Sequence, residues 1–395
     1  MIVLQENART GTVVSLTPSQ ADYLSKSGLV EVRPNGRTFT LAPKAKRVGA
    51  VHAYGLDIVV TPKVSIPRLL FMVGYALNPG FLPEDVEGVE AAGLWSIVAE
   101  TLCRNAERAL RRGVLHGYTT EHATSTVIRG RIRVGDQISK RPGRLTPVEI
   151  THDMFTVDIA ENRLLRAAII RMLTVPRVNG SIQNRLQHLL NRLTGVSPLV
   201  RAASLPRWRP HRLNAPYHAA LRIAELVLNA GSFEVGENGL SIASFVVNME
   251  KVFEDFVTTA LTEAWRSIPG RTERQYPAKL DTDGAVSMNV DVVHLVDDMP
   301  RIIVDAKYKL ESTSGRYPNT DLYQVIAYCI ALRVDRAWLV YAGDKANATS
   351  HNVLNSPITI TTYALDLGAP PQDLVGQIER LARASLPALS PHTTT

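Results

Sequence analysis

Two acids and a lysine fall close together in the last third of the sequence. Residues 301–310 read RIIVDAKYKL, so Asp305 and Lys307 follow an apolar run. Alternate side chains of a strand point to the same face, which places Asp305 and Lys307 side by side. Asp291 lies in the preceding apolar run, MNVDVV, and the sequence DDMP between the runs predicts a turn. If the two runs pair as strands, both carboxylates meet at one end of a sheet.

Converging carboxylates limit the chemistry that this segment can support. Two acids repel each other unless a cation neutralises them. Ligands that are all oxygen favour a hard divalent ion such as Mg²⁺, which also accepts phosphate oxygens of a substrate. The nearby ammonium group of Lys307 can orient a water molecule or balance charge on phosphorus. The pattern therefore predicts metal-assisted phosphodiester hydrolysis, against the alternative of an ordinary Asp–Lys pair at a strand end.

Helices on either side of these strands are expected to supply further polar groups. Residues 241–265 predict one amphipathic helix with an apolar stripe. Glu250 falls at the border of that stripe and is predicted to face the sheet, whereas Glu254 is rotated toward solvent. In a later helix Gln324 and Tyr328 are four residues apart and share a face. This pair could bind a DNA phosphate or brace the metal ligands, and the alternative is that the two side chains only pack.

The rest of the chain divides into three predicted regions. Residues 1–65 read as short strands, with Asn35-Gly36 at a hairpin turn. Residues 66–235 are mainly helical and include a basic hairpin. Residues 236–395 alternate helices and strands, for which a mixed sheet flanked by helices is the expected solution. The predicted class is thus α/β, or α+β for the chain as a whole.

The charge of the chain suits a polyanionic partner. The formal net charge is +7, and basic residues gather in two segments. Arg129, Arg131 and Arg133 lie in the predicted hairpin, and Trp208 is surrounded by Arg201, Arg207, Arg209 and Arg212. Arginines interleaved with an aromatic ring can neutralise phosphates and stack on bases, although a structural role within the chain is equally well supported.

Other features of the composition exclude several classes of protein. Cys103 and Cys329 are far apart in apolar segments and lack the spacing of a zinc or redox site, so both are predicted to be reduced core residues. No apolar run approaches the ~20 residues that cross a bilayer. The N-terminus lacks the features of a secretory signal. We therefore expect a cytoplasmic protein without a membrane partner.

Specific motifs in these segments resemble two related families. NVDVV, VDAKYK and QVIAY are similar to the PD-(D/E)xK nuclease core in its RecB-like form. The resemblance makes Asp291, Asp305 and Lys307 the motif and makes Gln324 and Tyr328 the QxxxY element. Beyond that core, LDIVVTPKVSIPRLLFMVGYAL, TVIRGRIRV and ENRLLRAAIIRML resemble the McrC family, the nuclease subunit of McrBC-type modification-dependent restriction systems.

The core motif departs from the family pattern at one position. Val290 stands where the motif has proline. Because that proline is not a ligand, activity is expected to survive.

The resemblance carries expectations about activity and partners. It implies a restriction-endonuclease-like C-terminal domain that cuts double-stranded, 5-methylcytosine-type methylated DNA with Mg²⁺, or with Mn²⁺ in its place. The partner would be an McrB-like AAA+ NTPase ring that uses GTP or ATP, with residues 1–65 docked on it. The sequence holds no GxxxxGK[ST] phosphate loop, so nucleotide hydrolysis falls to the partner.

The leading hypothesis, a nuclease subunit, assigns roles to residues. On this interpretation the metal is held by Asp291, Asp305, Glu250 and the backbone carbonyl of Ala306, and Lys307 lies near the attacking water. Lys309, further along the same strand face, contacts the DNA backbone, as do the arginines of the hairpin. Two alternatives remain open: a non-catalytic adaptor that binds a motor ring and DNA, and a stand-alone RecB-like nuclease that cuts without a partner.

Overall fold

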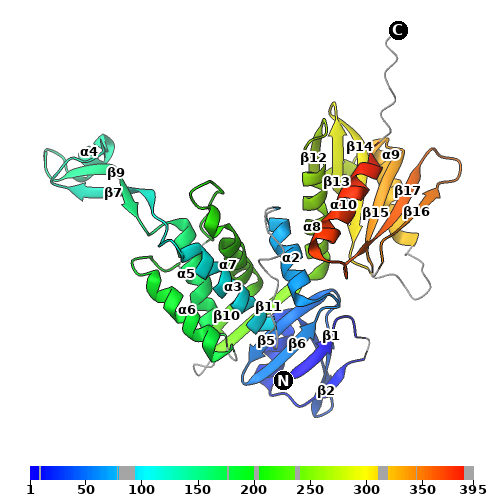
Figure 1. Ribbon diagram of the computed structural model, residues 1–395, viewed down its shortest axis with the longest axis horizontal. Helices are drawn as coiled ribbons and strands as arrows, with labels where there is room; N and C mark the ends of the chain where they lie inside the picture. The colour runs from blue at the N-terminus through cyan, green and yellow to red at the C-terminus, as the bar shows by residue number, and fades with distance from the viewer. Residues whose placement is uncertain are drawn as a thin grey trace, which may run out of the picture. The chain divides into compact units, whose positions relative to one another are not determined.

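The computed structural model divides the chain into two compact units. The first unit comprises Met1–Ile97 and Ala230–Thr395, and the second comprises Val98–Asn229. The structure describes residues 1–395 except 9, 78, 80–93, 176–177, 200–203, 236–240, 310–318, 344 and 387–395. Both ends of the sequence therefore belong to one unit, and the middle of the chain forms the other (Figure 1).

The N-terminal part of the first unit is rich in short strands. Its elements are β1 Ile2–Gln5, β2 Thr12–Val14, α1 Pro18–Ser27, β3 Val30–Asn35, β4 Thr38–Pro43, β5 Arg47–Ala53, β6 Leu56–Thr61 and α2 Ile66–Leu77. The predicted hairpin is present, because β3 pairs antiparallel with β4 and Gly36 takes a φ of +60° in the turn. Glycine adopts this left-handed conformation without the steric cost that a side chain brings.

The prediction of one helix over residues 241–265 is wrong. Strand β11 (Ser241–Asn248) comes first, pairing with β5 and with β10 (Gly231–Val235), and helix α8 (Met249–Ala264) follows. The side chain of Asn248 accepts a hydrogen bond from the Glu250 N–H and so caps the start of the helix. Paired residues before this cap complete a sheet that begins in the N-terminal part, and they do not extend the apolar stripe of α8.

The C-terminal part of the first unit is the predicted mixed sheet. Its strands are β12 Arg271–Lys279, β13 Ser287–Val296, β14 Met299–Lys307, β15 Arg336–Gly343, β16 Asn347–Asn352 and β17 Thr359–Asp366. They lie in the order β12-β13-β14-β15-β17-β16, with β14, β15 and β17 parallel to one another. The turn between β13 and β14 has positive φ angles at Asp297 and Asp298, as a tight hairpin requires.

Helices cover both faces of this sheet (Figure 1). Helix α9 (Asn319–Leu332) packs Val325 and Cys329 against Ile303 and other buried strand residues. Helices α8 and α10 (Pro371–Ser385) pack against each other. The indole N–H of Trp265, just after α8, donates to the Ala382 carbonyl at 3.2 Å. Since side chains alternate along β14, Asp305 and Lys307 share the face of Ile303, toward α9.

The second unit combines helices with a small three-stranded sheet. Its elements are α3 Leu94–Leu110, β7 Gly117–Ser125, β8 Arg131–Ile132, α4 Val134–Lys140, β9 Val148–Thr156, α5 Ala160–Leu173, α6 Gly180–Arg192, a short 3₁₀ helix Ala215–Tyr217 and α7 His218–Ala230. The sheet order is β7-β9-β8. None of the helices in the described part of the chain is both long and apolar enough to cross a bilayer.

The basic segment of this unit is not the simple hairpin that its sequence predicts. β7 and β8 each pair with β9, and not with each other. The approach of Gly130 to β9 explains why, since a Cβ at Gly130 would lie 2.3 Å from the Thr151 carbonyl oxygen. The chain before β8 is therefore held against β9, and Arg129 lies outside the strands.

Candidate functional site

The two aspartates predicted to converge do so at one end of the β13–β14 pair. The paired register of these antiparallel strands ends with Val292 opposite Val304. Beyond it, Asp291 Oδ2 accepts a hydrogen bond from the Ala306 N–H at 2.9 Å. A side-chain carboxylate thus satisfies a buried main-chain donor that the strand partner leaves unpaired. This contact fixes Asp291 beside the segment that carries Asp305 and Lys307.

Asp305 is a fully buried acid with few groups near it that offset its negative charge. Its relative exposure is 0%, and Oδ1 has no hydrogen-bond partner among the described residues. The Lys307 ammonium lies 2.8 Å from Asp305 Oδ2. Burial and then the Asp291 carboxylate raise the pKa of Asp305 above its ordinary value, although Lys307 opposes this shift. An uncompensated carboxylate oxygen of this kind marks a place suited to a further cation.

Lys307 keeps its positive charge beside Asp305 and Asp291. Burial lowers the pKa of its ammonium group, but Asp305 and then Asp291 raise it by more, so the pKa ends above its ordinary value. Its side chain is 17% exposed. The ammonium therefore stays protonated at neutral pH and retains limited access to the surface.

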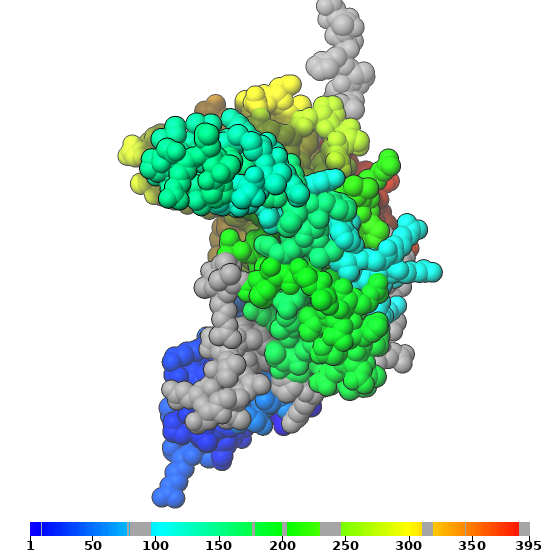
Figure 2. Space-filling model, turned by 90° about the vertical axis from the view of Figure 1, so that its left-hand side faces the viewer, coloured from blue at the N-terminus to red at the C-terminus, as the bar shows by residue number. Residues whose placement is uncertain are grey.

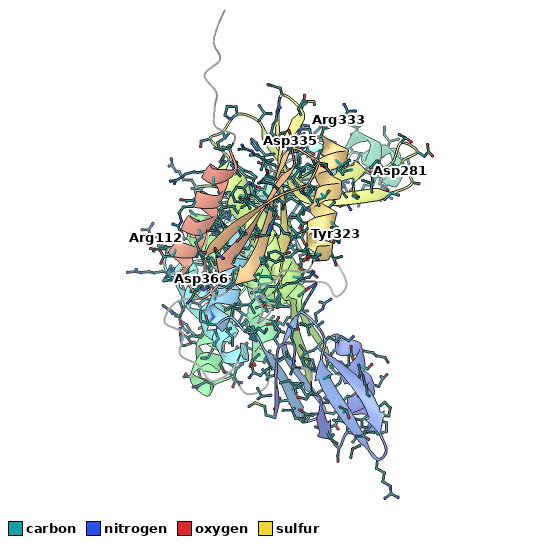
Figure 3. The ribbon with its side chains drawn as sticks, turned by 90° about the vertical axis from the view of Figure 1, so that its right-hand side faces the viewer. Arg112, Asp281, Tyr323, Arg333, Asp335 and Asp366 are labelled. Atoms are coloured by element: carbon teal, nitrogen blue, oxygen red, sulfur yellow. The ribbon has the colours of Figure 1, made fainter. Side chains whose placement is uncertain are left out.

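The predicted pair on α9 is formed, with one member buried and one exposed. Gln324 Nε2 donates to Tyr328 Oη at 2.6 Å, and Tyr328 Oη donates to the Asn289 carbonyl at 3.0 Å. Burial raises the pKa of Tyr328 to about 12, and the Asp305 carboxylate adds to the shift. Buried Tyr328 thus supports the site by its hydrogen bond to the Asn289 carbonyl of β13. Gln324 is exposed, on the same helix as the outward-facing Tyr323 (Figure 3).

The acid from α8 that lies near the aspartates is Glu254, and the choice of Glu250 is not supported by its contacts. Glu250 Oε1 forms an ion pair with Lys46 Nζ at 2.5 Å. Glu254 Oε1 accepts a hydrogen bond from Gln275 Nε2 at 2.5 Å, and the same nitrogen donates to Asp291 Oδ1 at 3.0 Å. Burial raises the pKa of Glu254, and the charge of Asp291 raises it further.

Sequence reasoning assigned Glu254 to solvent because it took helix and strand residues as one helix. The apolar stripe that set the expected facing direction included Ile242 and Phe245, which belong to β11. Gln275 was missed altogether, since an isolated glutamine in a strand gives no signal of its own. Glu254 and Gln275 come close to Asp291 only through tertiary contacts, which the sequence does not show.

Lys309 is engaged within the protein. Its Nζ lies 2.7 Å and 2.9 Å from the two carboxylate oxygens of Asp321, which is 4% exposed. Tyr341 Oη donates to the same carboxylate at 3.1 Å. This pair links the segment just after β14 to α9, so its contacts support a structural role and do not support the predicted contact with DNA. The metal-ligand role of the Ala306 carbonyl stays a prediction.

The donor set at Asp291 and Asp305 fits a hard divalent cation. Among the described residues, no group of three or more His, Cys, Asp or Glu side chains is arranged to hold a metal ion. Two carboxylates with the unpartnered Asp305 Oδ1 are what Mg²⁺ uses when it completes its shell with water and substrate phosphate. The site therefore suits Mg²⁺ and lacks the soft ligands that zinc prefers.

The basic clusters of the second unit are partly used for internal contacts. Arg133 forms ion pairs with Asp136 and, at 3.1 Å, with Glu149. Arg129 and Arg131 are exposed. Trp208 donates to Glu225 at 2.9 Å and packs against His218, with the Arg222 guanidinium 5.9 Å from its ring centre. Its ring thus has internal contacts that support a structural role, and Arg201 lies outside the described residues.

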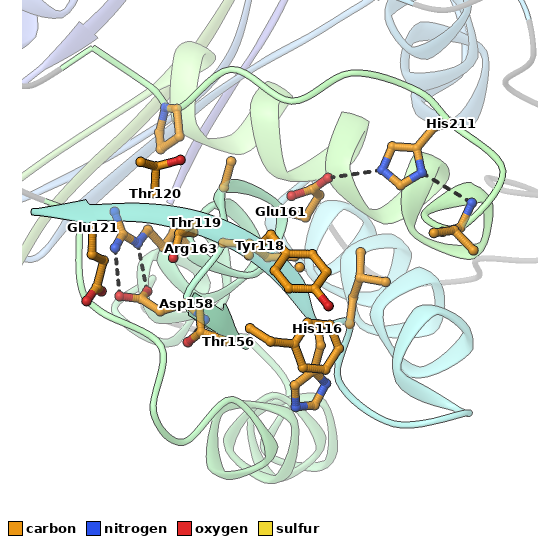
Figure 4. Close-up of a pocket in the computed structure, with 17 residues that line it drawn as sticks. His116, Tyr118, Thr119, Thr120, Glu121, Thr156, Asp158, Glu161, Arg163 and His211 are labelled. Atoms are coloured by element: carbon orange, nitrogen blue, oxygen red, sulfur yellow. Dashed lines mark hydrogen bonds and ion pairs between the residues drawn. The ribbon is translucent and has the colours of Figure 1, made fainter. Parts of the chain in front are cut away.

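A separate hollow of about 740 Å³ lies within the second unit, where β7 meets the start of α5 (Figure 4). Among its charged groups, Arg163 is paired with Asp158, and Glu161 lies 4.0 Å from His211. Its rim carries the ring of Tyr118, 5.1 Å from the ring of Phe155. The hollow holds none of the residues predicted to do chemistry.

Comparison with known proteins gives similarities to one kind of restriction system. The family model described as McrBC 5-methylcytosine restriction system component matches residues 44–342. The type IV methyl-directed restriction enzyme EcoKMcrBC of Escherichia coli (strain K12) is 21% identical over 298 residues, covering 69% of this chain and 82% of the relative.

Solved structures add a likeness of fold. A chain from the refined half-complex of the tetradecameric assembly of Thermococcus gammatolerans McrB AAA+ hexamers with bound McrC has a TM-score of 0.58 at 16% identity, covering 96% of this chain and 99% of that chain. A chain from the cryo-EM structure of the Thermococcus gammatolerans McrBC complex has a TM-score of 0.43 at 18% identity, covering 67% and 87%.

Proposed function

This chain belongs to the family of McrBC 5-methylcytosine restriction system components, and we propose that within such a system it is the McrC-like subunit that cuts DNA. It hydrolyses phosphodiester bonds of methylated double-stranded DNA with Mg²⁺, and Mn²⁺ can take its place. Its partner is an McrB-like AAA+ NTPase, whose hydrolysis of GTP or ATP it stimulates. The observation that carries the proposal is the buried pair Asp291 and Asp305 with Lys307 beside them.

The residues of the site divide the work of the reaction. Asp291 and Asp305 would hold the metal ion, which when bound polarises the scissile phosphate and acidifies a water molecule. The Lys307 ammonium, held by Asp305, orients the attacking water and offsets negative charge that develops on phosphorus. Gln324, exposed beside buried Tyr328, is placed to donate to a phosphate oxygen.

The experiment that tests the proposal uses the full chain. The chain is mixed with the AAA+ protein of its own system, nucleotide and methylated DNA, with Mg²⁺ or with a chelator. Cuts that require the divalent ion are expected. Cutting that persists in the chelator would overturn the proposal, and NTPase stimulation without cutting in any metal would favour the adaptor.

Glu254 is expected to matter for cleavage more than Glu250. Replacing Glu254 with glutamine removes a charge held next to Asp291 and should slow cleavage by roughly tenfold to a hundredfold, the usual cost of losing a group that supports metal ligands. The matched change Glu250→Gln loses only the Lys46 ion pair and should leave the cleavage rate within about twofold, since such pairs contribute less than about 1 kcal/mol. Equal cleavage rates in the two variants would contradict this assignment.

The surface that meets the partner is best placed on the small sheet of the second unit. Large exposed apolar side chains gather in residues 118–155, namely Tyr118, Val127, Ile128, Ile132, Val134, Ile138, Leu145, Met154 and Phe155. We call these residues the apolar surface; they lie on β7, β8, α4, β9 and the loops between them, in the turquoise lobe of Figure 2. Exposed apolar groups gathered in this way mark a protein contact, whereas DNA backbone contacts rely on charge. We therefore favour this surface over residues 1–65 for docking.

Charged substitutions on the apolar surface should disrupt assembly without unfolding the chain. Ile128 is 60% and Ile138 is 67% exposed, so aspartate at both positions costs little in the free protein. We expect the double variant to bind the AAA+ partner at least about thirtyfold more weakly, equal to about 2 kcal/mol. Val286→Asp, at a 47% exposed position in the first unit, is the control and should bind normally. Unchanged affinity of the double variant, measured by interferometry, would refute the placement.

A further inference from the structure

Gln275 stands directly across the sheet from Asp291. In the β12–β13 pair, Arg274 is opposite Val292 and Tyr276 is opposite Val290, so Gln275 falls opposite Asp291. The backbone of Gln275 has a φ of +48°. This left-handed conformation is uncommon for a residue with a side chain and persists where the surroundings enforce it. A costly backbone conformation therefore coincides with the strand position that faces a candidate metal ligand.

The side-chain amide of Gln275 joins two acids. Its Nε2 donates both of its protons, to Glu254 Oε1 at 2.5 Å and to Asp291 Oδ1 at 3.0 Å. The two carboxylates come from different elements, α8 and β13. Like charges brought this close repel each other unless a donor lies between them. The amide supplies that donor without adding a charge that would compete with a cation.

Both oxygens of Asp291 are consequently fixed. Oδ1 accepts from Gln275 and Oδ2 accepts from the Ala306 N–H at 2.9 Å. Each carboxylate oxygen has a second lone pair that these bonds leave available. Asp305 receives no comparable support, because its ion-pair partner is Lys307 on its own strand. The orientation of Asp291 is thus set by β12 through Gln275 and by β14 through Ala306, and the metal need not set it on binding.

We propose that Gln275 is a positioning residue that presets Asp291 for the divalent cation by hydrogen-bonding it beside Glu254, and that its strained backbone holds the amide between the two acids. The inference rests on the proposed function, since it concerns the affinity of the same metal site. Outer groups that orient a metal ligand change metal affinity by about 10- to 100-fold. Gln275 does not contact the reacting atoms, so its loss should be compensated by a higher metal concentration.

The test removes the amide without straining the backbone. Gln275→Gly deletes both hydrogen bonds, and glycine accepts the φ of +48° more readily than any other residue. Asn355→Gly is the matched control, because Asn355 has a φ of +56° in a turn of the same unit and, among the described residues, makes no contact with the site. Mn²⁺ binding to the full chain is measured by calorimetry without DNA, and the Mg²⁺ concentration for half-maximal cleavage is measured in the assembled system.

The expected result is a tenfold or larger loss of Mn²⁺ affinity in Gln275→Gly. The same shift is expected in the Mg²⁺ needed for cleavage, with most of the rate recovered at saturating Mg²⁺, while Asn355→Gly matches the unmodified protein. Unchanged metal affinity in Gln275→Gly would overturn the inference and leave the proposed function standing. If the unmodified protein neither binds Mn²⁺ nor needs Mg²⁺, the proposed function itself fails.

Discussion

Replacing Asp305 with asparagine is expected to lower DNA cleavage by at least about a thousandfold, equal to roughly 4 kcal/mol of transition-state stabilisation. Asparagine has the same size and shape, so it fits a position with 0% exposure. Its neutral amide offers one weak oxygen ligand where the carboxylate offers two charged ones, and a hard divalent ion binds it poorly. The measurement is the rate of cutting methylated DNA by the variant in complex with its AAA+ partner.

A second buried aspartate provides the control for this variant. Asp321 is 4% exposed and is also paired with a lysine, Lys309. Among the described residues it makes no contact with Asp291. Asp321→Asn should lower the melting temperature and leave the cleavage rate within a fewfold of normal. Asp305→Asn should retain partner binding and NTPase stimulation. Cleavage by Asp305→Asn at a near-normal rate would refute the metal-ligand role.

Replacing Lys307 with methionine should make the stability of the protein depend on divalent cations. The ammonium is the counter-charge closest to Asp305, and removing one partner of a buried pair costs about 3 kcal/mol. Asp305 and Asp291 would then repel each other with no nearby positive charge to offset them. A bound Mg²⁺ can supply that charge in place of the ammonium. We expect a melting temperature several degrees below normal in chelator and a clear recovery in Mg²⁺.

Cleavage should not recover along with stability. Without the Lys307 ammonium, the attacking water and the developing charge lose their nearest cationic group, and the rate should fall by about a hundredfold even at saturating Mg²⁺. Lys309→Met is the matched control, since it breaks the comparable pair with Asp321. Its stability loss should be indifferent to Mg²⁺. A melting temperature of Lys307→Met that Mg²⁺ does not raise would contradict a cation site at these acids.

The sequence by itself determined the centre of the site. Asp291, Asp305 and Lys307 are fixed by strand periodicity and by one short turn, both of which are local properties of the chain. The mixed sheet follows from the alternation of helices and strands in the same way. The pair Gln324 and Tyr328 was also predictable, because residues four apart in a helix are neighbours whatever the helix packs against.

Only the tertiary structure decided which groups surround that centre. The contacts place Glu254, and not Glu250, beside Asp291, whereas the predicted helix began eight residues too early, at Ser241, and so its apolar stripe included strand residues. Gln275 joins the site through cross-strand pairing with Asp291. Lys309 is bound to Asp321. Each of these outcomes depends on which distant partner a polar group finds.

The basic clusters show the same limit at the surface. Counting arginines predicts a polyanion contact, yet Arg133 is paired with Glu149 and the Trp208 ring is packed within the second unit. The exposure of the apolar surface could not be predicted from the sequence either. Apolar side chains in a predicted strand are expected to be buried, and only the structure shows that these are exposed. Periodicity is encoded locally and can be read from sequence, whereas the pairing of charges and the burial of apolar groups are settled by residues far apart in the chain.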